Sequence, residues 1–277
     1  MRFTTRLASI GGILFALGSV GSGIIDLLWG QFEAAHRPIQ AWGDHIPGLT
    51  LLLCTSAVAL IAAGVIVAFE RFRRQGAIVL ATLYFVFSIF SLPRLLTAPR
   101  ILGHSFSVYV VGLVTSFQQL ILAIAAGCIV ENKSRVAGPC AFRRSVLVRG
   151  LFGICLCDFG LAHFTSTQAV AAIIPTWMPF NATFLTLISG IAFILFGAAI
   201  LLRRYDIWAA QGLGVMLATF SLVVLMPRLL QNPHSQIAWG GNAYNITAIG
   251  AAWVFASWLS AQSSNSSAAG VEAPRRY

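Results

Sequence analysis

Six side chains of this 277-residue chain could bind a ligand or move a proton: Asp26, Arg94, Asp158, His163, Trp177 and Arg228. They stand in a sequence that is 58% hydrophobic and 9% charged, whereas a soluble domain carries about 25% charged residues. This deficit predicts that the chain lies in lipid. An ionisable group in an apolar span is costly, and it is kept where it faces the protein interior and has a partner or a function.

Asp158 is the most costly of these residues. It lies about 13 residues into the apolar run that starts near residue 145, or roughly 20 Å along a helix, which is slightly past the middle of a bilayer. A carboxylate at that depth costs on the order of 3 kcal/mol. Two interpretations follow, namely a site for a proton or a ligand, or a structural pairing with an arginine or a hydroxyl group.

An internal repeat relates the other ionisable residues to one another. Three pieces of the second half, 160–163, 174–179 and 227–228, have faint copies at 23–26, 44–47 and 93–94. The separation is roughly 130–140 residues each time, which indicates a duplication. Asp26 is then equivalent to His163, and Arg94 to Arg228.

Each equivalent pair has two interpretations. Asp26 and His163 could form an ion pair or a proton relay if the copies face each other, or they could be two unrelated interfacial residues. Of Arg94 and Arg228, which each follow a proline, we expect at least one to point inward toward Asp26, Asp158 or an anionic ligand. The alternative is that both reach outward to lipid head groups. For Trp177 we expect only a place in the interfacial aromatic belt.

The hydropathy pattern predicts an all-α membrane protein with eight transmembrane helices, arranged as two four-helix repeats of parallel orientation. The expected spans are 7–29, 49–69, 75–92, 105–130, 145–164, 182–202, 206–226 and 239–260. The first unit, which is degenerate, covers 1–130, a basic linker covers 131–144, and the second unit covers 145–260. Residues 261–277, rich in Ser, Asn and Ala, are expected to be disordered.

The basic residues predict the orientation. Of the 18 lysines and arginines, all lie on the side of the termini except Arg37, Arg94, Arg100 and Arg228. The positive-inside rule then places both termini in the cytoplasm of a multi-pass inner-membrane protein. The basic clusters stand between apolar runs, so the net charge of +10 does not indicate nucleic-acid binding. The lipid bilayer is the expected partner.

Cysteine and metal chemistry are not expected. The five cysteines form no Cys-x-x-Cys, and Cys155 and Cys157 cannot share a helix face. We therefore expect no disulfide relay and no metal site.

The repeat pieces resemble the DoxX-like family of small membrane proteins, whose unit has four transmembrane helices. The resemblance rests on Gly160 and His163, on the loop with Pro175, Trp177 and Pro179, and on Pro227 followed by Arg228. The first copy fits loosely, because His45 stands where the tryptophan would be. Members of that family include subunits of membrane oxidoreductases, among them a thiosulfate:quinone oxidoreductase.

The resemblance therefore implies an accessory role in a quinone-linked membrane oxidoreductase, with an outward-facing polar pocket and quinone as the cofactor. Two alternatives stay open. The chain could carry or bind a small lipophilic or anionic molecule, as parallel repeats around a shared cavity do in transporters, or it could be a structural partner of another membrane protein. The motifs carry no catalytic signature, so the sequence leaves open whether the chain is an enzyme.

Overall fold

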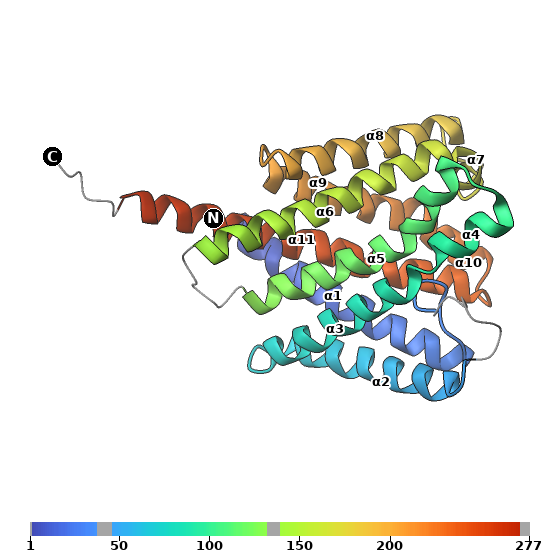
Figure 1. The fold of residues 1–277 in the computed structure, drawn as a ribbon, viewed down its shortest axis with the longest axis horizontal. Coiled ribbons are helices and arrows are strands. Elements are labelled where there is room, and N and C mark those ends of the chain that lie inside the picture. Colours follow the sequence, from blue (N-terminus) through green and yellow to red (C-terminus); the bar gives the residue numbers. More distant parts are fainter. Residues whose placement is uncertain (1, 38–45, 132–138, 272–277) are drawn as a thin grey trace.

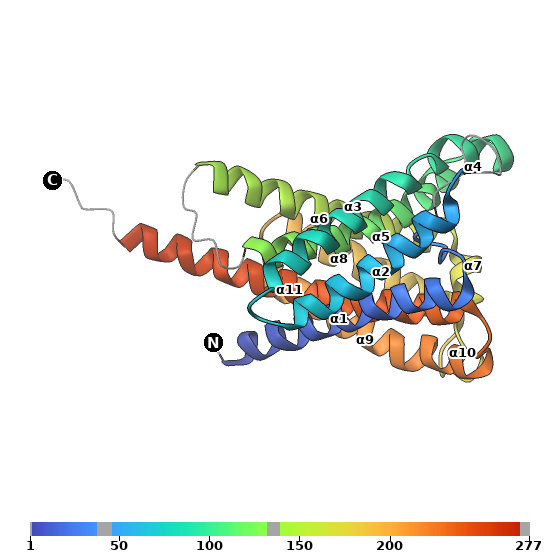
Figure 2. The same cartoon turned by 90° about the horizontal axis from the view of Figure 1, so that it is seen from below.

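Long helices lie side by side in the computed structural model, which describes residues 2–37, 46–131 and 139–271 (Figures 1 and 2). The described residues form helices and connections without a strand. The helices are α1 (Arg2–Trp29), α2 (Leu49–Ala68), α3 (Arg73–Ser91), α4 (Arg94–Leu102), α5 (Phe106–Glu131), α6 (Pro139–Thr165), α7 (Thr167–Ala171), α8 (Ala182–Leu201), α9 (Asp206–Phe220), the π-helical η1 (Ser221–Leu225), α10 (Met226–Gln231) and α11 (Gln236–Val271). Asp44 and His45 of the repeat, and residues 132–138 of the basic linker, lie outside the described residues.

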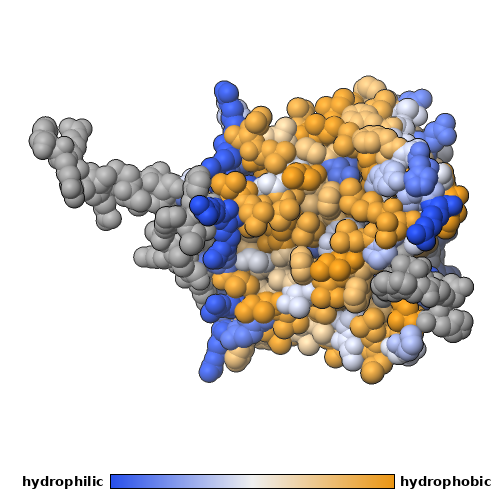
Figure 3. All heavy atoms as spheres, viewed as in Figure 1, coloured by the Kyte–Doolittle hydropathy of each residue, from blue (hydrophilic) through white to orange (hydrophobic). Residues whose placement is uncertain are grey.

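Seven helical segments of the described chain are long and apolar enough to cross a membrane: Ser9–Trp29, Leu49–Ala68, Arg73–Leu102, Phe106–Glu131, Arg143–Thr165, Ala182–Leu201 and Asp206–Gln231. A broad apolar band covers the molecular surface between two polar ends (Figure 3). Large apolar side chains such as Leu28, Leu51 and Leu222 are 70% exposed or more. Because such a surface is stable in hydrocarbon and not in water, the chain has the character of a multi-pass integral membrane protein.

The span expected at 239–260 lies in α11, which is not among the seven apolar segments. Polar side chains such as Asn242, Asn245 and Thr247 lower the mean hydropathy of this helix, and all three are buried. α11 packs against α1, α5 and α9, so these polar groups face protein rather than lipid. The helix continues to Val271, into the tail for which disorder is predicted, and residues 272–277 lie outside the described part.

Both prolines that were expected to end a span are followed by helix. α3 ends at Ser91, and Pro93 caps the short helix α4, so Arg94 lies in a helical first turn. The prediction that Pro227 ends its helix is wrong, because helical backbone runs from Asp206 to Gln231. The π-helical turn of η1 directly precedes this proline. Such a turn changes the hydrogen-bond register, which accommodates a residue that lacks an N–H group.

Small residues allow two helix pairs to approach closely. In the pair α6–α8, a methyl group on Gly153 would lie 3.0 Å from the Gly197 carbonyl oxygen, and one on Gly160 would lie 2.7 Å from that of Gly190. In the pair α1–α2, a methyl group on Gly23 would lie 2.6 Å from the Ala57 carbonyl oxygen, and one on Gly64 would lie 3.0 Å from that of Ala16. Close backbone approach through small residues is the main packing device of helices in lipid, where burial of apolar surface drives little association.

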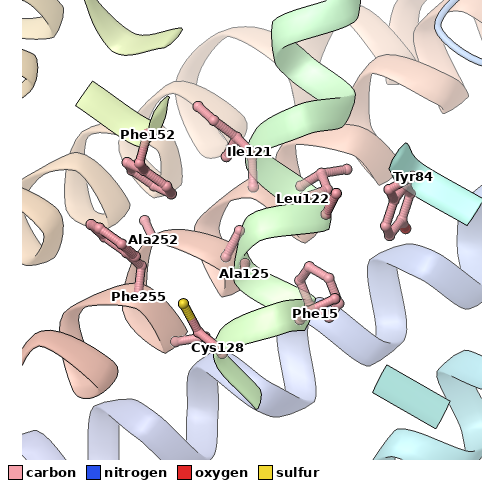
Figure 4. Close-up of a cluster of buried hydrophobic side chains, with 14 of the residues drawn as sticks. Phe15, Tyr84, Ile121, Leu122, Ala125, Cys128, Phe152, Ala252 and Phe255 are labelled. Carbon is pink, nitrogen blue, oxygen red and sulfur yellow. The ribbon is translucent and has the colours of Figure 1, made fainter. Parts of the chain in front are cut away.

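The apolar core surrounds α5 (Figure 4). Leu122 and Ala125 of α5 lie between Phe15 and Tyr84 on one side and Phe152 and Phe255 on the other. Phe152 of α6 and Phe255 of α11 stack with ring centroids 4.0 Å apart. The two halves of the chain therefore share one core.

The closest contact between the halves is that of α1 with α11. A methyl group on Gly18 would lie 2.5 Å from the backbone nitrogen of Thr247 and 2.8 Å from the carbonyl oxygen of Ala243. We expect Gly18→Val to separate α1 from α11 and to cost about 3 kcal/mol, which is roughly 6–12 °C in the melting temperature of a chain this size. Thermal unfolding in mild detergent, followed by circular dichroism, measures it.

The control is Gly12→Val on the same helix, where an added methyl group meets no atom within 4 Å. It should melt within about 2 °C of the wild type, since surface substitutions typically change stability by less than 0.5 kcal/mol. Equal melting temperatures for the two variants would contradict the close approach of α1 and α11.

Candidate functional site

A cavity of about 400 Å³ lies between α5, α6, α7, α8, α9, η1 and α11. Most of its wall is aliphatic and aromatic, including Phe159, Phe193 and Phe220, and its polar lining residues are Gln118, His163, Ser189, Tyr244 and Asn245. The lining residues lie near the end of α6, the start of α5 and the start of α11, and these helix ends meet at the right of Figure 1, away from the start of α1. An apolar cavity with a few polar groups is the usual form of a small-molecule site.

The π-helical segment η1, which contributes Leu225 to the cavity wall, is held by two asparagines of α11. Asn245 donates through Nδ2 to the Leu217 carbonyl oxygen (2.8 Å) and to Ser221 Oγ (2.7 Å). Asn242 donates through Nδ2 to the Leu225 carbonyl oxygen (3.1 Å). The two amides bind carbonyl groups on either side of the π turn, which would otherwise be costly to bury in hydrocarbon. π-Helical turns recur at functional sites.

His163 is the cavity residue with a free ring nitrogen. Its Nδ1 lies 2.7 Å from the carbonyl oxygen of Phe159, which can only accept a hydrogen bond, so Nδ1 carries the proton. In the neutral ring Nε2 then keeps its lone pair. The ring is tilted against Phe193, with centroids 5.2 Å apart. His163 can therefore accept a hydrogen bond from a hydroxyl group of a molecule in the cavity.

Five of the six sequence-predicted residues do not line this cavity, and three of them, Asp158, Trp177 and Arg228, belong to no other cluster described below. Asp158 lies on another face of α6, with only 6% of its surface exposed, and its Oδ2 has no hydrogen-bond partner among the described residues. Trp177 is 59% exposed in the connection between α7 and α8. Arg228 is exposed on α10. The structure thus brings only His163 of the six to the cavity.

Asp26 belongs to a separate buried cluster at the same end of the bundle. It is fully buried, and its carboxylate accepts hydrogen bonds from the backbone N–H of Glu33 (2.6 Å) and from Nδ1 of His36 (2.9 Å). Nε2 of His36 lies 4.0 Å from Oε2 of Glu33, and the imidazole stacks on Phe87 with centroids 4.5 Å apart. We call Asp26, Glu33 and His36 the acidic–histidine cluster. Asp26 and His163 have separate partners, so no ion pair forms between them.

Arg94 lies above the acidic–histidine cluster without an ion pair to it. Its guanidinium donates to Thr115 Oγ1 on α5 and contacts the carbonyl oxygen of Ala34 at 3.5 Å. It therefore connects α4 and α5 to the segment of residues 31–37, while Arg228 is exposed.

Sequence reasoning missed Glu33, His36, Asn242 and Asn245. Glu33 and His36 follow Asp26 closely in the chain, between the spans expected at 7–29 and 49–69. Asn242 and Asn245 lie within the span expected at 239–260. The signal that could have identified all four is their position close to or within an apolar segment. A polar group at such a position must find a partner inside the protein.

The described residues contain no group of three or more His, Cys, Asp or Glu side chains that could hold a metal ion. Cys54, Cys128, Cys155 and Cys157 are free thiols.

Comparison with known proteins finds a match to a family model. A family model described as a domain of unknown function (DUF8561) matches residues 152–259. No curated protein and no solved structure matches the chain. The matched segment begins in α6 and ends in α11, so it contains six of the seven helical elements that wall the cavity, all except α5.

The acidic–histidine cluster predicts how stability depends on pH. Burial lowers the pKa of His36, but the hydrogen bond to Asp26 and the charge of Glu33 outweigh it, so the pKa is raised. Burial also raises the pKa of Glu33. A raised pKa means that the folded protein holds its proton more tightly, so this stability is fully present below the unfolded pKa and is lost as pH rises through the folded value.

We therefore expect the melting temperature of the wild type to fall as pH rises from about 6.5, the ordinary pKa of histidine. His36→Gln should flatten that decline and cost about 3 kcal/mol at pH 6, because it leaves a buried carboxylate without its charged partner. His104→Gln, which changes an exposed histidine, should keep the wild-type profile. An identical decline in wild type and His36→Gln would contradict this account.

Proposed function

We propose that this protein binds a small lipophilic molecule with a hydrogen-bonding head group in the cavity between α5 and the helices of the second unit. The observation that carries the proposal is an apolar cavity of about 400 Å³ in a membrane-embedded bundle, with its polar groups confined to a few positions. An apolar tail would contact Phe159, Phe193 and Phe220. A head group would meet His163, Gln118, Ser189 and Tyr244.

Molecules of this class reach such a site from the bilayer, in which they dissolve. Binding then depends on hydrogen bonds that hydrocarbon cannot offer, so the polar wall residues decide which lipophile is retained. The π turn and its two asparagines hold this wall in place without using the lone pair of His163 Nε2.

A second candidate is the accessory role in a quinone-linked oxidoreductase that the DoxX-like resemblance implies. The same cavity supports it, since a quinone combines an apolar tail with a head group that accepts and, once reduced, donates hydrogen bonds. Reduction of an added quinone by the purified protein, alone or with a co-purifying partner, would favour this candidate. Retention of the molecule without electron transfer favours a binder or carrier.

We further propose that α11 is the eighth span, that residues 1–130 and 145–260 are two units of the same orientation, and that both termini lie in the cytoplasm of the inner membrane. The equivalent small-residue contacts of α1–α2 and α6–α8 support the two units, as does the match of the family model to 152–259. α1 packs on α11 and α6 packs on α5, as two related units would. The basic residues near the termini support the orientation.

Filling the cavity tests the proposed function. A methyl group on Gly241, which lines the cavity, would meet no atom within 4 Å, so Gly241→Leu can place a side chain in the cavity without moving the backbone. We expect wild-type protein purified in mild detergent to retain one class of lipophilic molecule, and Gly241→Leu to reduce its amount at least tenfold. Organic extraction and mass spectrometry measure this amount per mole of protein.

The matched control is Gly127→Leu on α5, where an added methyl group also meets no atom within 4 Å and which does not line the cavity. It should retain the wild-type amount. Equal retention by both variants would show that the molecule binds elsewhere, and no retained molecule even in the wild type would contradict the proposed function.

A second prediction concerns His163. His163→Phe keeps an aromatic ring of similar size and removes the acceptor Nε2. A long-chain phenol should compete for the cavity about tenfold less well with this variant than with the wild type, which is the effect of one hydrogen bond of roughly 1.4 kcal/mol. The corresponding alkylbenzene should compete equally with both. An equal loss for the two competitors would mean that His163 acts only through packing.

A further inference from the structure

The segment of residues 31–37 joins two sites that lie at the same end of the bundle. On one side it forms the acidic–histidine cluster with α1 through Asp26. On the other it contacts the first turns of α11, where the side-chain amides of Gln31 and Gln236 are hydrogen bonded at 2.9 Å and Gln236 Nε2 donates to the Gln31 carbonyl oxygen at 2.9 Å.

The acidic–histidine cluster and the lipophilic cavity lie on opposite sides of the same helix, α11. Gly240 packs directly on Glu33, because a methyl group there would lie 2.9 Å from the Glu33 carboxyl carbon. The next residue, Gly241, lines the cavity, and Asn245, one turn further, holds η1. A displacement of Glu33 therefore acts on the helix that forms the cavity wall.

The cluster responds to protons because of its composition. The cluster holds two carboxyl groups beside one imidazole, and a protonated His36 offsets negative charge on them. Loss of protons from His36 and Glu33 leaves two carboxylates, Asp26 and Glu33, close together in a site that excludes water. Like charges in such a site repel strongly, and the repulsion acts on the contact between Glu33 and Gly240.

The surrounding titratable and charged groups do not offset this change. They are Asp26 on α1, Glu33 in the same segment, Tyr84 on α3 and Tyr244 on α11, which both interact electrostatically with Glu33, and Arg94 on α4, which contacts the Ala34 carbonyl oxygen. The tyrosines are uncharged at neutral pH. Arg94 is directed at Thr115 and at backbone rather than at a carboxylate.

We infer that Asp26, Glu33 and His36 form a proton-binding site whose occupancy controls the lipophilic cavity through the first turns of α11. With protons bound, Glu33 is seated on Gly240 and the cavity wall is ordered. Without them, the segment of residues 31–37 separates from α11, and the wall made by Asn242, Asn245 and η1 loosens. This regulation rests on the proposed function of the cavity, while proton binding itself does not.

Hydrogen–deuterium exchange on the full-length, ligand-free protein in mild detergent tests the inference. Exchange of the backbone of residues 216–225 is measured between pH 6 and pH 8.5 and corrected for the intrinsic pH dependence of exchange. We expect the corrected exchange rate in the wild type to rise at least tenfold over this range. Residues 194–202 of α8, which do not line the cavity, should change less than twofold.

Two variants locate the cause. In Glu33→Gln the second carboxylate is absent, so no repulsion develops and exchange of residues 216–225 should stay slow at pH 8.5. In His36→Gln the imidazolium beside Asp26 is absent, so exchange at pH 6 should be faster than in the wild type. His104→Gln should behave as the wild type does. Should His36→Gln fail to fold, Glu33→Gln alone decides.

Two results would overturn the inference. One is a wild-type response to pH in Glu33→Gln, and the other is an exchange rate of residues 216–225 that does not change with pH in the wild type. Neither result bears on whether the cavity binds a lipophile, which is read from the molecules retained by Gly241→Leu and Gly127→Leu. Conversely, a cavity that retains nothing would leave the exchange result, and with it the proton-binding site, in place.

Discussion

Hydrocarbon offers no hydrogen bonds, and this constraint decides where every polar group of the chain lies. The large exposed side chains over the apolar band belong to residues such as Leu28, Leu51 and Leu222. The polar groups of the spans turn inward, where Asp26, Asn242 and Asn245 are nearly or fully buried and hydrogen bonded. Buried polar side chains of the spans thus find partners within the protein, while apolar side chains cover the surface between the two polar ends.

The two halves use this interior differently. In the first half Tyr84 donates to Ser19, and Asp26 holds His36, so polar side chains fill the space between the helices. In the second half the corresponding space is a cavity with an apolar wall. The π turn before Pro227 alters the backbone hydrogen bonding of its helix, and asparagines of α11 bind the carbonyl groups around it.

Small residues make this arrangement possible. Gly18 lets α1 contact the backbone of α11, and Gly240 and Gly241 leave room for Glu33 on one side of α11 and for the cavity on the other. A side chain at Gly240 would collide with Glu33, whereas one at Gly241 would meet open space. Two adjacent glycines therefore separate a charged cluster from an apolar cavity within a single helical turn.

The sequence by itself determined the helical class, the membrane environment and the approximate position of the apolar spans, because these depend on the composition of continuous segments. It also singled out Asp158 as a costly carboxylate, and Asp26 and His163 as either an ion pair or two unrelated interfacial residues. It did not predict the partners that Asp26 and His163 have in the structure. His36 reaches Asp26 only because the segment of residues 31–37 folds back over the end of α1, and Asn245 reaches Leu217 only because α11 packs beside α9. The helix continues past Pro227 through the π turn. This turn is stabilised by contacts with α11, which is distant in sequence. The cavity was likewise decided by tertiary structure, since its wall combines six helices and η1. The space that remains between packed helices cannot be predicted from the sequence of any one of them.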